Sequence, residues 1–456
     1  MKRTLADAAR VLSATLYGAD RPFGPVSTDT RTLEAGDLFV ALRGPQFDAN
    51  EFVPVADERL AAGAVVERLH SISLPQLLVR DTLSALTALA RAWRGNFVLP
   101  LIGVSGSNGK TTVKEMAASI MSQTGTCLAT RANLNNHIGV PLTLMRLNAS
   151  HASAVIEMGA NRSGDVAELC ALARPTVGLV TNAGAEHLEG FGSLEGAARA
   201  EGEMFSALAG DGTAVINAGD GFAPLWRELA GARQTVTFGV TAGSDFTARD
   251  LRQRIDANGP GLEFTLVAPQ GERRVHMRLV GRHNAINALA AAAAASAAGA
   301  GLDACVRGLE AVRAVRGRLE IKTAANGAAI IDDSYNANPS SLRAAIDVLH
   351  EVAGGAWLVL GDMVELGDFA IDSHKDAGHY ARANGIARLF AVGELSRHAV
   401  DTFGAGAEWF PDAEALIGRL ARELPPNATV LVKGSRVNRL ERVVEALARA
   451  PYMKTA

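Results

Sequence analysis

The stretch GVSGSNGKTT, residues 103–112, combines glycines, a lysine and hydroxyl side chains in an order that suits the binding of a polyphosphate. Gly106 and Gly109 let the backbone turn tightly, so that several N–H groups can point at one anion. A helix predicted to begin near Lys110 adds the positive end of its dipole. Lys110 would supply a charge for the β- and γ-phosphates, and the Thr111 hydroxyl would lie where Mg²⁺ binds. The predicted phosphate-binding residues are Gly106, Ser107, Asn108, Gly109, Lys110, Thr111 and Thr112.

This loop departs by one place from the usual GxxxxGK[ST] spacing, because position 104 is Val rather than Gly. An ordinary glycine-rich turn is the alternative. We favour the phosphate loop because an apolar strand precedes it and a segment with helical apolar spacing follows it. The residues alone leave a kinase, a nucleotide switch and a ligase open. The sequence contains no guanine-reading NKxD motif, which argues against a GTP switch.

Two further polar residues follow predicted strands. Glu157 closes the apolar run at 152–158, and His187 follows the run at 176–182. The carboxyl ends of parallel strands meet at one edge of a sheet, where phosphoryl-transfer sites add metal ligands. We therefore expect both side chains near Thr111. The alternatives are a solvated glutamate and a structural histidine.

The composition indicates a folded protein with a local anion site. The chain has 456 residues, 48% of them apolar, and Lys+Arg (45) nearly balance Asp+Glu (48), for a formal net charge of −3. We expect no nucleic-acid partner, which would require a basic domain or stripe. The three cysteines show neither a disulfide framework nor a zinc pattern. The N-terminus lacks signal-peptide features, and the Ala-rich run at 288–300 is too short for a bilayer, so we expect a cytoplasmic protein without stable membrane insertion.

The order of apolar runs predicts an α/β protein with three domains. Strand and helix patterns alternate from about residue 98 and again from about residue 318, which is typical of parallel sheets covered on both faces. The first segment carries two short strand patterns and a helix at 82–95. We place the domains at 1–97, 98–316 and 317–456.

Seven motifs in order resemble those of the Mur ligases of bacterial cell-wall synthesis. Besides the phosphate loop they are NLNNHIGVP (Asn133–Pro141), EMGANRSGD (Glu157–Asp165), TNAGAEHLEGFGS (Thr181–Ser193), GRHNAINALAA (Gly281–Ala291), DDSYNANP (Asp332–Pro339) and LGDMVELG (Leu360–Gly367). The resemblance covers nearly the whole chain. It implies a small α/β domain for a UDP-substrate, a central P-loop ATPase with a mainly parallel sheet, and a Rossmann-like C-terminal domain.

The resemblance also implies a reaction. With ATP and Mg²⁺, the carboxylate of UDP-N-acetylmuramoyl-tripeptide would become an acyl phosphate, and the amine of D-alanyl-D-alanine would then attack it to form an amide, ADP and phosphate. The stretch at 27–50, together with DDSYNANPSS and GDMVELG, resembles the family member with this activity. Another Mur-type or folylpolyglutamate-type amino acid ligase is the alternative. We expect a monomer.

The family's functional residues carry over to matching positions. Thr111 and Glu157 would hold one Mg²⁺, and His187 would help to hold a second. Asn287 would face the adenine, while Arg318 and Asp333 would reach ATP from the third domain. The predicted contacts to the UDP-substrate are Thr30, Arg31, Asp48, Asn50, Asn135 and Asn136.

One departure concerns a lysine that several family members carry in carbamylated form. The aligned residue here is Glu201, in ARAEGEMFSAL (Ala198–Leu208). We interpret Glu201 as a replacement for the carbamate near the second Mg²⁺, so that Glu201→Gln would raise the Mg²⁺ requirement. The alternative is a solvated Glu201, with Glu203 or water in that role.

A second anion site is predicted in the third domain. Lys433, Ser435 and Arg436 follow a strand pattern, and they would bind a carboxylate or the acyl phosphate. The alternative is a solvated basic loop. Tyr335, Asn336 and Asn338 are further candidates for the acceptor dipeptide, and polar turn residues beside Pro339 are the alternative there.

Overall fold

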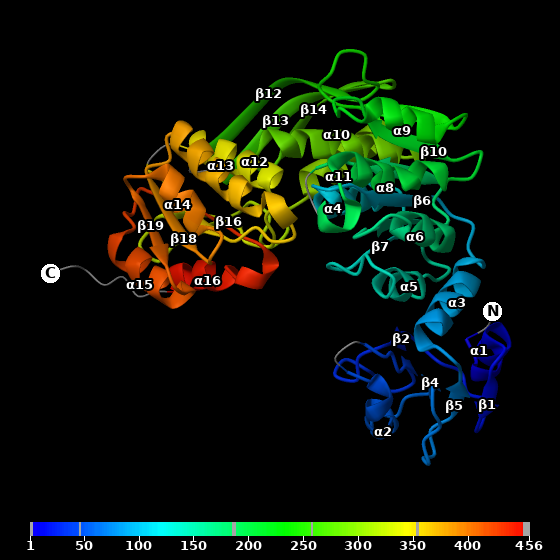
Figure 1. Cartoon of the computed structure of the whole chain (residues 1–456). Helices are drawn as coiled ribbons and strands as arrows, with labels where there is room; N and C mark the ends of the chain where they lie inside the picture. The colour runs from blue at the N-terminus through cyan, green and yellow to red at the C-terminus, as the bar shows by residue number, and fades with distance from the viewer. Residues whose placement is uncertain (1–2, 45–46, 185–187, 257–258, 353–354, 450–456) are drawn as a thin grey trace.

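Three α/β domains follow one another along the chain, as the sequence predicts (Figure 1). The structure is a computed structural model that describes residues 3–44, 47–184, 188–256, 259–352 and 355–449. The N-terminal domain and the C-terminal domain lie at opposite ends, with the middle domain between them. The proposed boundaries at residues 97 and 316 remain a prediction.

The N-terminal domain is built on a five-stranded sheet of order β1-β5-β4-β3-β2, in which only the β1–β5 pair is antiparallel. Its strands are β1 (Thr15–Tyr17), β2 (Val26–Ser27), β3 (Leu38–Val40), β4 (Gly63–Val66) and β5 (Gln76–Leu78). Its helical segments are α1 (Leu5–Leu12), η1 (Ala49–Phe52), α2 (Val53–Glu58) and α3 (Thr82–Arg94). Helix α1 begins after Thr4, which is its N-cap.

A six-stranded, all-parallel sheet of order β11-β10-β9-β6-β8-β7 forms the middle domain. The strands are β6 (Leu101–Ser105), β7 (Cys127–Ala129), β8 (Ser153–Glu157), β9 (Val177–Val180), β10 (Thr213–Asn217) and β11 (Gln234–Phe238). The helices are α4 (Lys110–Met121), α5 (Gly139–Leu144), α6 (Asp165–Ala173), α7 (Leu188–Phe191), α8 (Leu194–Ser206), α9 (Ala223–Ala230), α10 (Arg282–Ala297) and α11 (Leu302–Ala311). Both faces of the sheet are covered, so the strands β6, β8, β9 and β10 are buried along their whole length.

The close packing of α10 against α4 and the sheet explains why the sequence has an Ala-rich run there. Every residue from Ala288 to Ala295 is buried, against α4 and the strands beneath it. Small side chains allow this close packing, so the Ala-rich run forms a buried helix of the middle domain. Within the described residues, no helix is long and apolar enough to cross a membrane.

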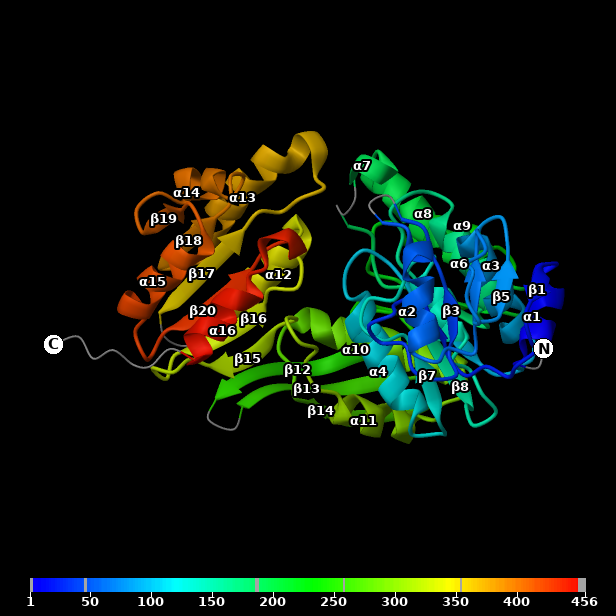
Figure 2. The ribbon, with the colours of Figure 1, turned by 90° about the horizontal axis from the view of Figure 1, so that it is seen from below.

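An antiparallel sheet that the sequence reading did not predict lies against the same core. Its strands are β12 (Thr247–Asp256), β13 (Gly259–Ala268) and β14 (Gly271–Met277). Leu262, Phe264 and Leu266 alternate into the core with α10 and α4 beneath them. The two longer strands, β12 and β13, extend toward the C-terminal domain (Figure 2).

The C-terminal domain has a six-stranded sheet of order β15-β16-β20-β17-β18-β19, parallel except for β15. Its strands are β15 (Glu320–Thr323), β16 (Ala329–Asp333), β17 (Ala356–Gly361), β18 (Arg388–Val392), β19 (Ala407–Phe410) and β20 (Thr429–Lys433). One face carries α12 (Pro339–His350), α13 (Ala370–Ala383) and α14 (Arg397–Phe403), and the other carries α15 (Ala413–Glu423) and α16 (Glu441–Arg449). The short turns η2 (Gly367–Phe369) and η3 (Arg436–Asn438) complete it.

A buried histidine in this domain gives a prediction about pH. His374 is fully buried; its Nδ1 bonds the Ala370 carbonyl at 2.6 Å, and its Nε2 accepts a hydrogen bond from Met363 N at 2.9 Å. Burial lowers the pKa of His374 below its usual value. The unfolded chain therefore takes up a proton below about pH 6.5 that the folded chain does not, and stability falls as the pH decreases. We expect His374→Gln to flatten the acid side of a plot of melting temperature against pH, and an unchanged slope would contradict this.

Candidate active site

The phosphate loop joins β6 to α4 in the predicted way. Helix α4 begins at Lys110, and both Gly106 (φ 120°) and Gly109 (φ 83°) have the left-handed backbone that favours glycine. Helix α4 therefore directs its N-terminal N–H groups at the loop. The geometry does not support the alternative of an ordinary turn far from a ligand cavity, since the loop lines a cavity of the described chain.

Hydrogen bonds fasten the loop to the carboxyl end of β9. The backbone N–H of Ser107 donates to the Asn182 carbonyl at 2.9 Å, and Asn108 N donates to the Asn182 side chain at 3.0 Å. The Thr181 hydroxyl donates to the Asn108 carbonyl at 2.7 Å. These bonds fix the shape of the loop before any ligand binds.

Glu201, on α8, supports the same loop from behind. Its side chain is buried, and its Oε2 accepts hydrogen bonds from Gly106 N at 2.7 Å and from the Ser105 hydroxyl. The alternative of a solvated Glu201 is therefore wrong. Glu203 instead accepts from the N–H groups of Gly164 (2.8 Å) and Ala167 (3.2 Å) at the start of α6. Glu201 does not line the cavity, and its role as a carbamate replacement remains a prediction.

Lys110, Thr111 and Glu157 meet at the edge of the parallel sheet, as predicted. Thr111 Oγ1 donates to Glu157 Oε1 at 3.2 Å, and Asn135 Nδ2 donates to the same oxygen at 2.9 Å. Lys110 Nζ donates to the carbonyls of Gly106 (2.5 Å) and Ser107 (3.0 Å). His187 lies outside the described residues.

The donor set fits a magnesium ion. Glu157 is buried, and its Oε2 makes no hydrogen bond within the described part of the chain. An anionic oxygen that is buried without a partner is costly unless a cation satisfies it. The described residues hold no cluster of three or more His, Cys, Asp or Glu side chains that could enclose a metal. Mg²⁺ commonly binds through one or two carboxylates together with substrate phosphates and water, so Thr111 and Glu157 suffice as its protein ligands.

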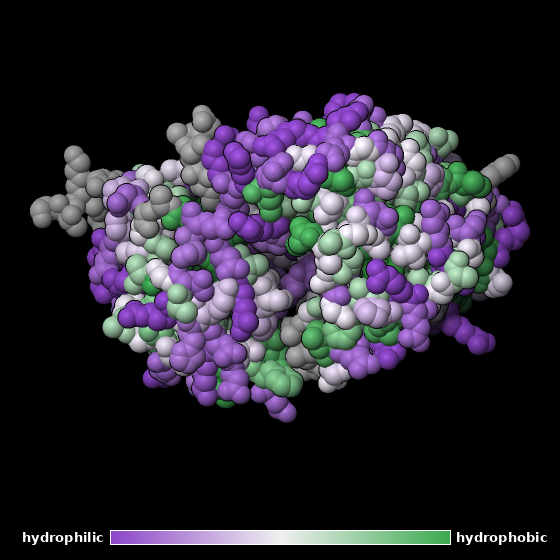
Figure 3. All heavy atoms as spheres, turned by 90° about the horizontal axis from the view of Figure 1, so that it is seen from above, coloured by the Kyte–Doolittle hydropathy of each residue, from purple (hydrophilic) through white to green (hydrophobic). Residues whose placement is uncertain are grey.

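A cavity of about 630 Å³ lies where the middle and C-terminal domains meet. Figure 3 shows a hollow near the middle of the upper face, with hydrophilic residues at its edge. The predicted residues that line the cavity are Ser107 to Thr112, Asn135, Asn136, Glu157, Asn287, Arg318, Asp333, Tyr335, Asn336, Asn338 and Lys433. The structure thus brings most of the predicted ATP and acceptor residues to one place.

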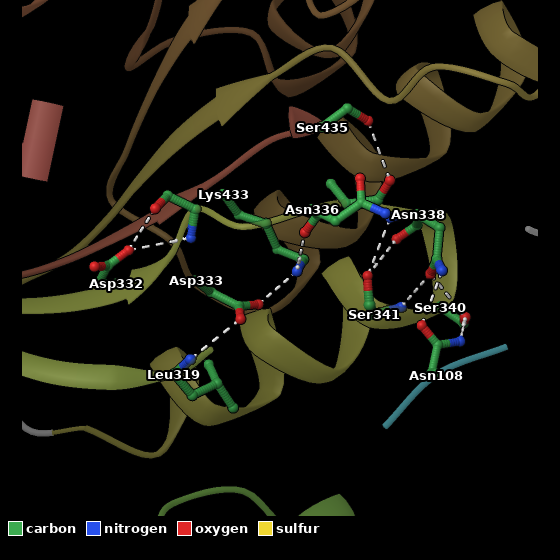
Figure 4. Close-up of polar contacts among 12 residues, drawn as sticks. Asn108, Leu319, Asp332, Asp333, Asn336, Asn338, Ser340, Ser341, Lys433 and Ser435 are labelled. Atoms are coloured by element: carbon green, nitrogen blue, oxygen red, sulfur yellow. Dashed lines mark hydrogen bonds and ion pairs between the residues drawn. The ribbon is translucent and has the colours of Figure 1, made fainter. Parts of the chain in front are cut away.

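The C-terminal domain contributes charged groups to this cavity (Figure 4). Arg318 Nη2 donates to Thr111 Oγ1 at 3.0 Å, and its guanidinium lies 4.4 Å from the centre of the Tyr335 ring. Asp333 pairs with Lys433 and accepts the Leu319 N–H at 3.1 Å. Lys433 is buried, and its second bond goes to the Asn336 carbonyl at 3.0 Å.

Lys433, Ser435 and Arg436 do not gather into one anion pocket. Of the three, only Lys433 lines the cavity. Ser435 is buried, donates to the Ala337 carbonyl at 3.3 Å and accepts from Val364 N at 3.1 Å. Arg436 is exposed and bonds Glu441 at 3.1 Å. The proposed carboxylate site is therefore reduced to Lys433.

The predicted residues of the N-terminal domain lie away from this cavity. Arg31 pairs with Asp29, and Asp48 accepts from the Asn50 side chain at 2.8 Å, which lowers the pKa of Asp48. Asn50 is buried and accepts the Glu67 N–H at 3.1 Å. Thr30 is half-buried. Their contact with a UDP-substrate remains a prediction.

Several cavity residues are not among those predicted from the sequence, and two of them are polar residues on α10. His283 and Asn284 lie on α10, on the same face as Asn287, and all three line the cavity. Asn287 donates to the Asn284 side chain at 3.0 Å. Burial lowers the pKa of His283, although Asp333 acts in the opposite direction. The motif GRHNAIN contained the signal, since residues three and four positions before Asn287 lie on its side of a helix.

The phosphate loop gives a prediction about Gly109. A Cβ at this position would lie 2.6 Å from Asn287 Oδ1, and the backbone there is left-handed. Both the clash and the strain oppose alanine, at about 1–2 kcal/mol for the backbone conformation alone. We expect Gly109→Ala to weaken nucleotide binding at least tenfold in calorimetry. Gly221→Ala, with nothing near its Cβ, is the control and should bind as the parent does.

Comparison with known proteins identifies the family of this chain. Family models match at residues 104–295, the Mur ligase middle domain, and at 317–436, the Mur ligase glutamate ligase domain. The chain belongs to the Mur ligase family. A UDP-N-acetylmuramoyl-tripeptide–D-alanyl-D-alanine ligase of Escherichia coli is 45% identical over 97% of this Mur ligase and 98% of the relative. The enzyme of the same name from Bacillus subtilis is 34% identical over 99% of both chains.

Solved structures agree with the family. A MurF crystal structure from Acinetobacter baumannii matches this Mur ligase with a TM-score of 0.91 and 34% identity, over 99% of both chains. A MurF ligase from Thermotoga maritima in complex with ADP matches with a TM-score of 0.81 and 26% identity, over 93% of this chain and 97% of that one. The three-domain α/β fold predicted from the sequence is confirmed.

Proposed function

We propose that this Mur ligase uses ATP to join D-alanyl-D-alanine to UDP-N-acetylmuramoyl-tripeptide, with an acyl phosphate as the intermediate. The observation that supports this best is the cavity between the middle and C-terminal domains, which faces the phosphate loop and Glu157 on one side and Arg318, Asp333 and Lys433 on the other. The similarity along the full chain to ligases of that name gives the substrates. ATP as the nucleotide is supported by the relative in complex with ADP.

The reaction requires that a peptide carboxylate approach an anionic phosphate. Lys110, at the start of α4, and Arg318, reaching across from the C-terminal domain, would neutralise the charge that gathers there. Mg²⁺ held by Thr111 and Glu157 would lower the repulsion further and orient the γ-phosphate. Asn287 would contact the adenine, while Asp333 would hold the ribose.

The meeting of two domains at one cavity also protects the intermediate. An acyl phosphate in open water would hydrolyse before an amine reached it. Side chains from both domains line the cavity, so closure removes water from the reacting carboxyl group and brings Lys433 and the segment 335–338 toward the acceptor. We also propose that the enzyme works as a monomer in the cytoplasm, where ATP is available.

A single incubation tests the proposal. The pure protein is mixed with ATP, Mg²⁺, UDP-N-acetylmuramoyl-tripeptide and D-alanyl-D-alanine, and the products are identified by mass. We expect the pentapeptide product with equal amounts of ADP and phosphate. Amide formation with a single amino acid in place of the dipeptide would favour another ligase of this build, and phosphate release without an amide would contradict the proposal.

A further inference from the structure

Three side chains form a ring of hydrogen bonds across the joint between the middle and C-terminal domains (Figure 4). Asn338 Nδ2 donates to Asn108 Oδ1 at 2.8 Å, and Asn108 Nδ2 donates to Ser340 Oγ at 3.0 Å. The Ser340 hydroxyl closes the ring by donating to Asn338 Oδ1 at 3.0 Å. Asn108 belongs to the phosphate loop, and the other two residues belong to the start of α12.

The direction of the ring follows from the helix cap. Asn338 is the N-cap of α12, and its Oδ1 accepts the backbone N–H of Ser341 at 2.8 Å. A backbone N–H can only donate, so the atom of Asn338 that faces it is the oxygen, and the NH₂ group must face Asn108. Asn338 is buried, whereas Ser340 is exposed, so one side of the ring faces solvent.

The backbone of Asn108 is fixed just as firmly on its other side. Its N–H and carbonyl are bound to the Asn182 and Thr181 side chains, at 3.0 Å and 2.7 Å. The side chain therefore projects from a rigid loop to the C-terminal domain. Both of its amide atoms are used there, and its backbone N–H already donates to Asn182, so the phosphate contact of Asn108 remains a prediction.

A second hydrogen bond between the middle and C-terminal domains is expected to break when ligands bind. Arg318 donates to the Thr111 hydroxyl, which is the oxygen expected to meet Mg²⁺. That link must rearrange when metal and nucleotide bind. The ring lies beside the phosphate site rather than on the metal ligands, so it can persist with nucleotide in place.

We propose that the Asn108–Ser340–Asn338 ring is a latch that holds the C-terminal domain against the phosphate loop, and that Asn108 is a positioning residue for the acceptor half of the reaction. Only the second part of this inference, the role of Asn108 in the acceptor half of the reaction, rests on the proposed function. A neutral hydrogen bond is worth about two- to tenfold in an equilibrium constant, so loss of the ring is expected to cost about tenfold in kcat/KM for the dipeptide.

Gly184 lies close to two members of the ring. A Cβ at this position would lie 3.0 Å from Asn108 Nδ2 and 3.3 Å from Ser340 Oγ. A methyl group there presses on both partners at once. Gly184→Ala is therefore a second way to open the latch, without change to any of its three side chains.

The first experiment measures the position of the domains by small-angle X-ray scattering, without substrates. The variants are Asn108→Ala, Ser340→Ala and Asn338→Ser; serine keeps the N-cap of α12 but cannot reach Asn108. We expect each variant to have a larger radius of gyration than the parent. Asp412→Ala, which removes the N-cap of α15 elsewhere in the same domain, is the control for a lost cap and should scatter as the parent does. Identical scattering for parent and ring variants would overturn the latch.

The second experiment is a double-mutant cycle on kcat/KM for D-alanyl-D-alanine at saturating ATP and UDP-tripeptide. If the ring acts as a unit, Asn108→Ala combined with Asn338→Ser lowers kcat/KM no further than the worse single variant. If the effects of the two substitutions on kcat/KM multiply instead, the ring does not act as a unit and the proposal is wrong. If the parent makes no amide product, the proposed function fails while the scattering result still decides the latch.

Discussion

Lys110→Ala is expected to lower the turnover number about a thousandfold, the largest effect of any single change in this chain. Phosphoryl transfer depends on charge neutralisation more than on covalent chemistry by the protein. Lys110 stands at the first position of α4, and its Nζ lies 2.5 Å and 3.0 Å from the Gly106 and Ser107 carbonyls. It therefore already lies across the loop that would wrap the phosphates. Release of ADP with both peptide substrates present is the measurement.

Two variants separate this effect from a general loss of charge. Lys375→Ala removes an exposed lysine from α13, where it pairs with Asp372 at 3.5 Å, and should turn over as the parent does. Lys110→Arg keeps the charge but replaces a compact ammonium with a planar fork, so we expect partial activity. If the Lys110→Ala enzyme retained more than a tenth of the parent's turnover, the proposal that this loop binds the phosphates would be wrong.

The features predicted from the sequence are those set by neighbours in the chain. The turn at Gly106 and Gly109, the helix that begins at Lys110 and the placement of Glu157 at a strand end each follow from about ten residues of local pattern. Parallel strands then bring such ends together by geometry alone. This is why the pairing of Thr111 and Glu157, 46 positions apart, is predictable from the sequence alone.

The features that were missed depend on contacts between distant segments or on faint patterns. The strands β13 and β14 do alternate between core and surface residues, but the charged outer face of β14 obscured that signal. The ring of Asn108, Ser340 and Asn338 joins residues more than two hundred positions apart. Its existence depends on how two domains sit together, which no local pattern contains. Likewise, the burial of Ser435 follows from the packing of the 362–364 segment above it.

Glu157→Gln is expected to lower turnover about a hundredfold at ordinary Mg²⁺ concentrations and to raise the Mg²⁺ concentration needed for half-maximal rate. Glutamine has nearly the shape of glutamate, so its oxygen can still accept from Thr111 Oγ1 and Asn135 Nδ2. The second position changes from an anionic oxygen to an NH₂ group. In the parent that oxygen is buried and makes no hydrogen bond to any described residue. The substitution therefore removes a metal ligand while it leaves the packing intact.

A Mg²⁺ titration of parent and variant distinguishes a metal ligand from a structural carboxylate. If Glu157 binds the ion, excess Mg²⁺ recovers part of the lost rate, because the weaker site is refilled by mass action. If Glu157 only orients Thr111 and Asn135, glutamine preserves those bonds and the titration curve keeps its midpoint. Glu195→Gln, the same change at an exposed position of α8 that pairs with Arg199, is the matched control and should titrate as the parent does. A parent-like midpoint for Glu157→Gln would therefore exclude the carboxylate as a ligand, and the magnesium ion would have to be held by the phosphates and Thr111 alone.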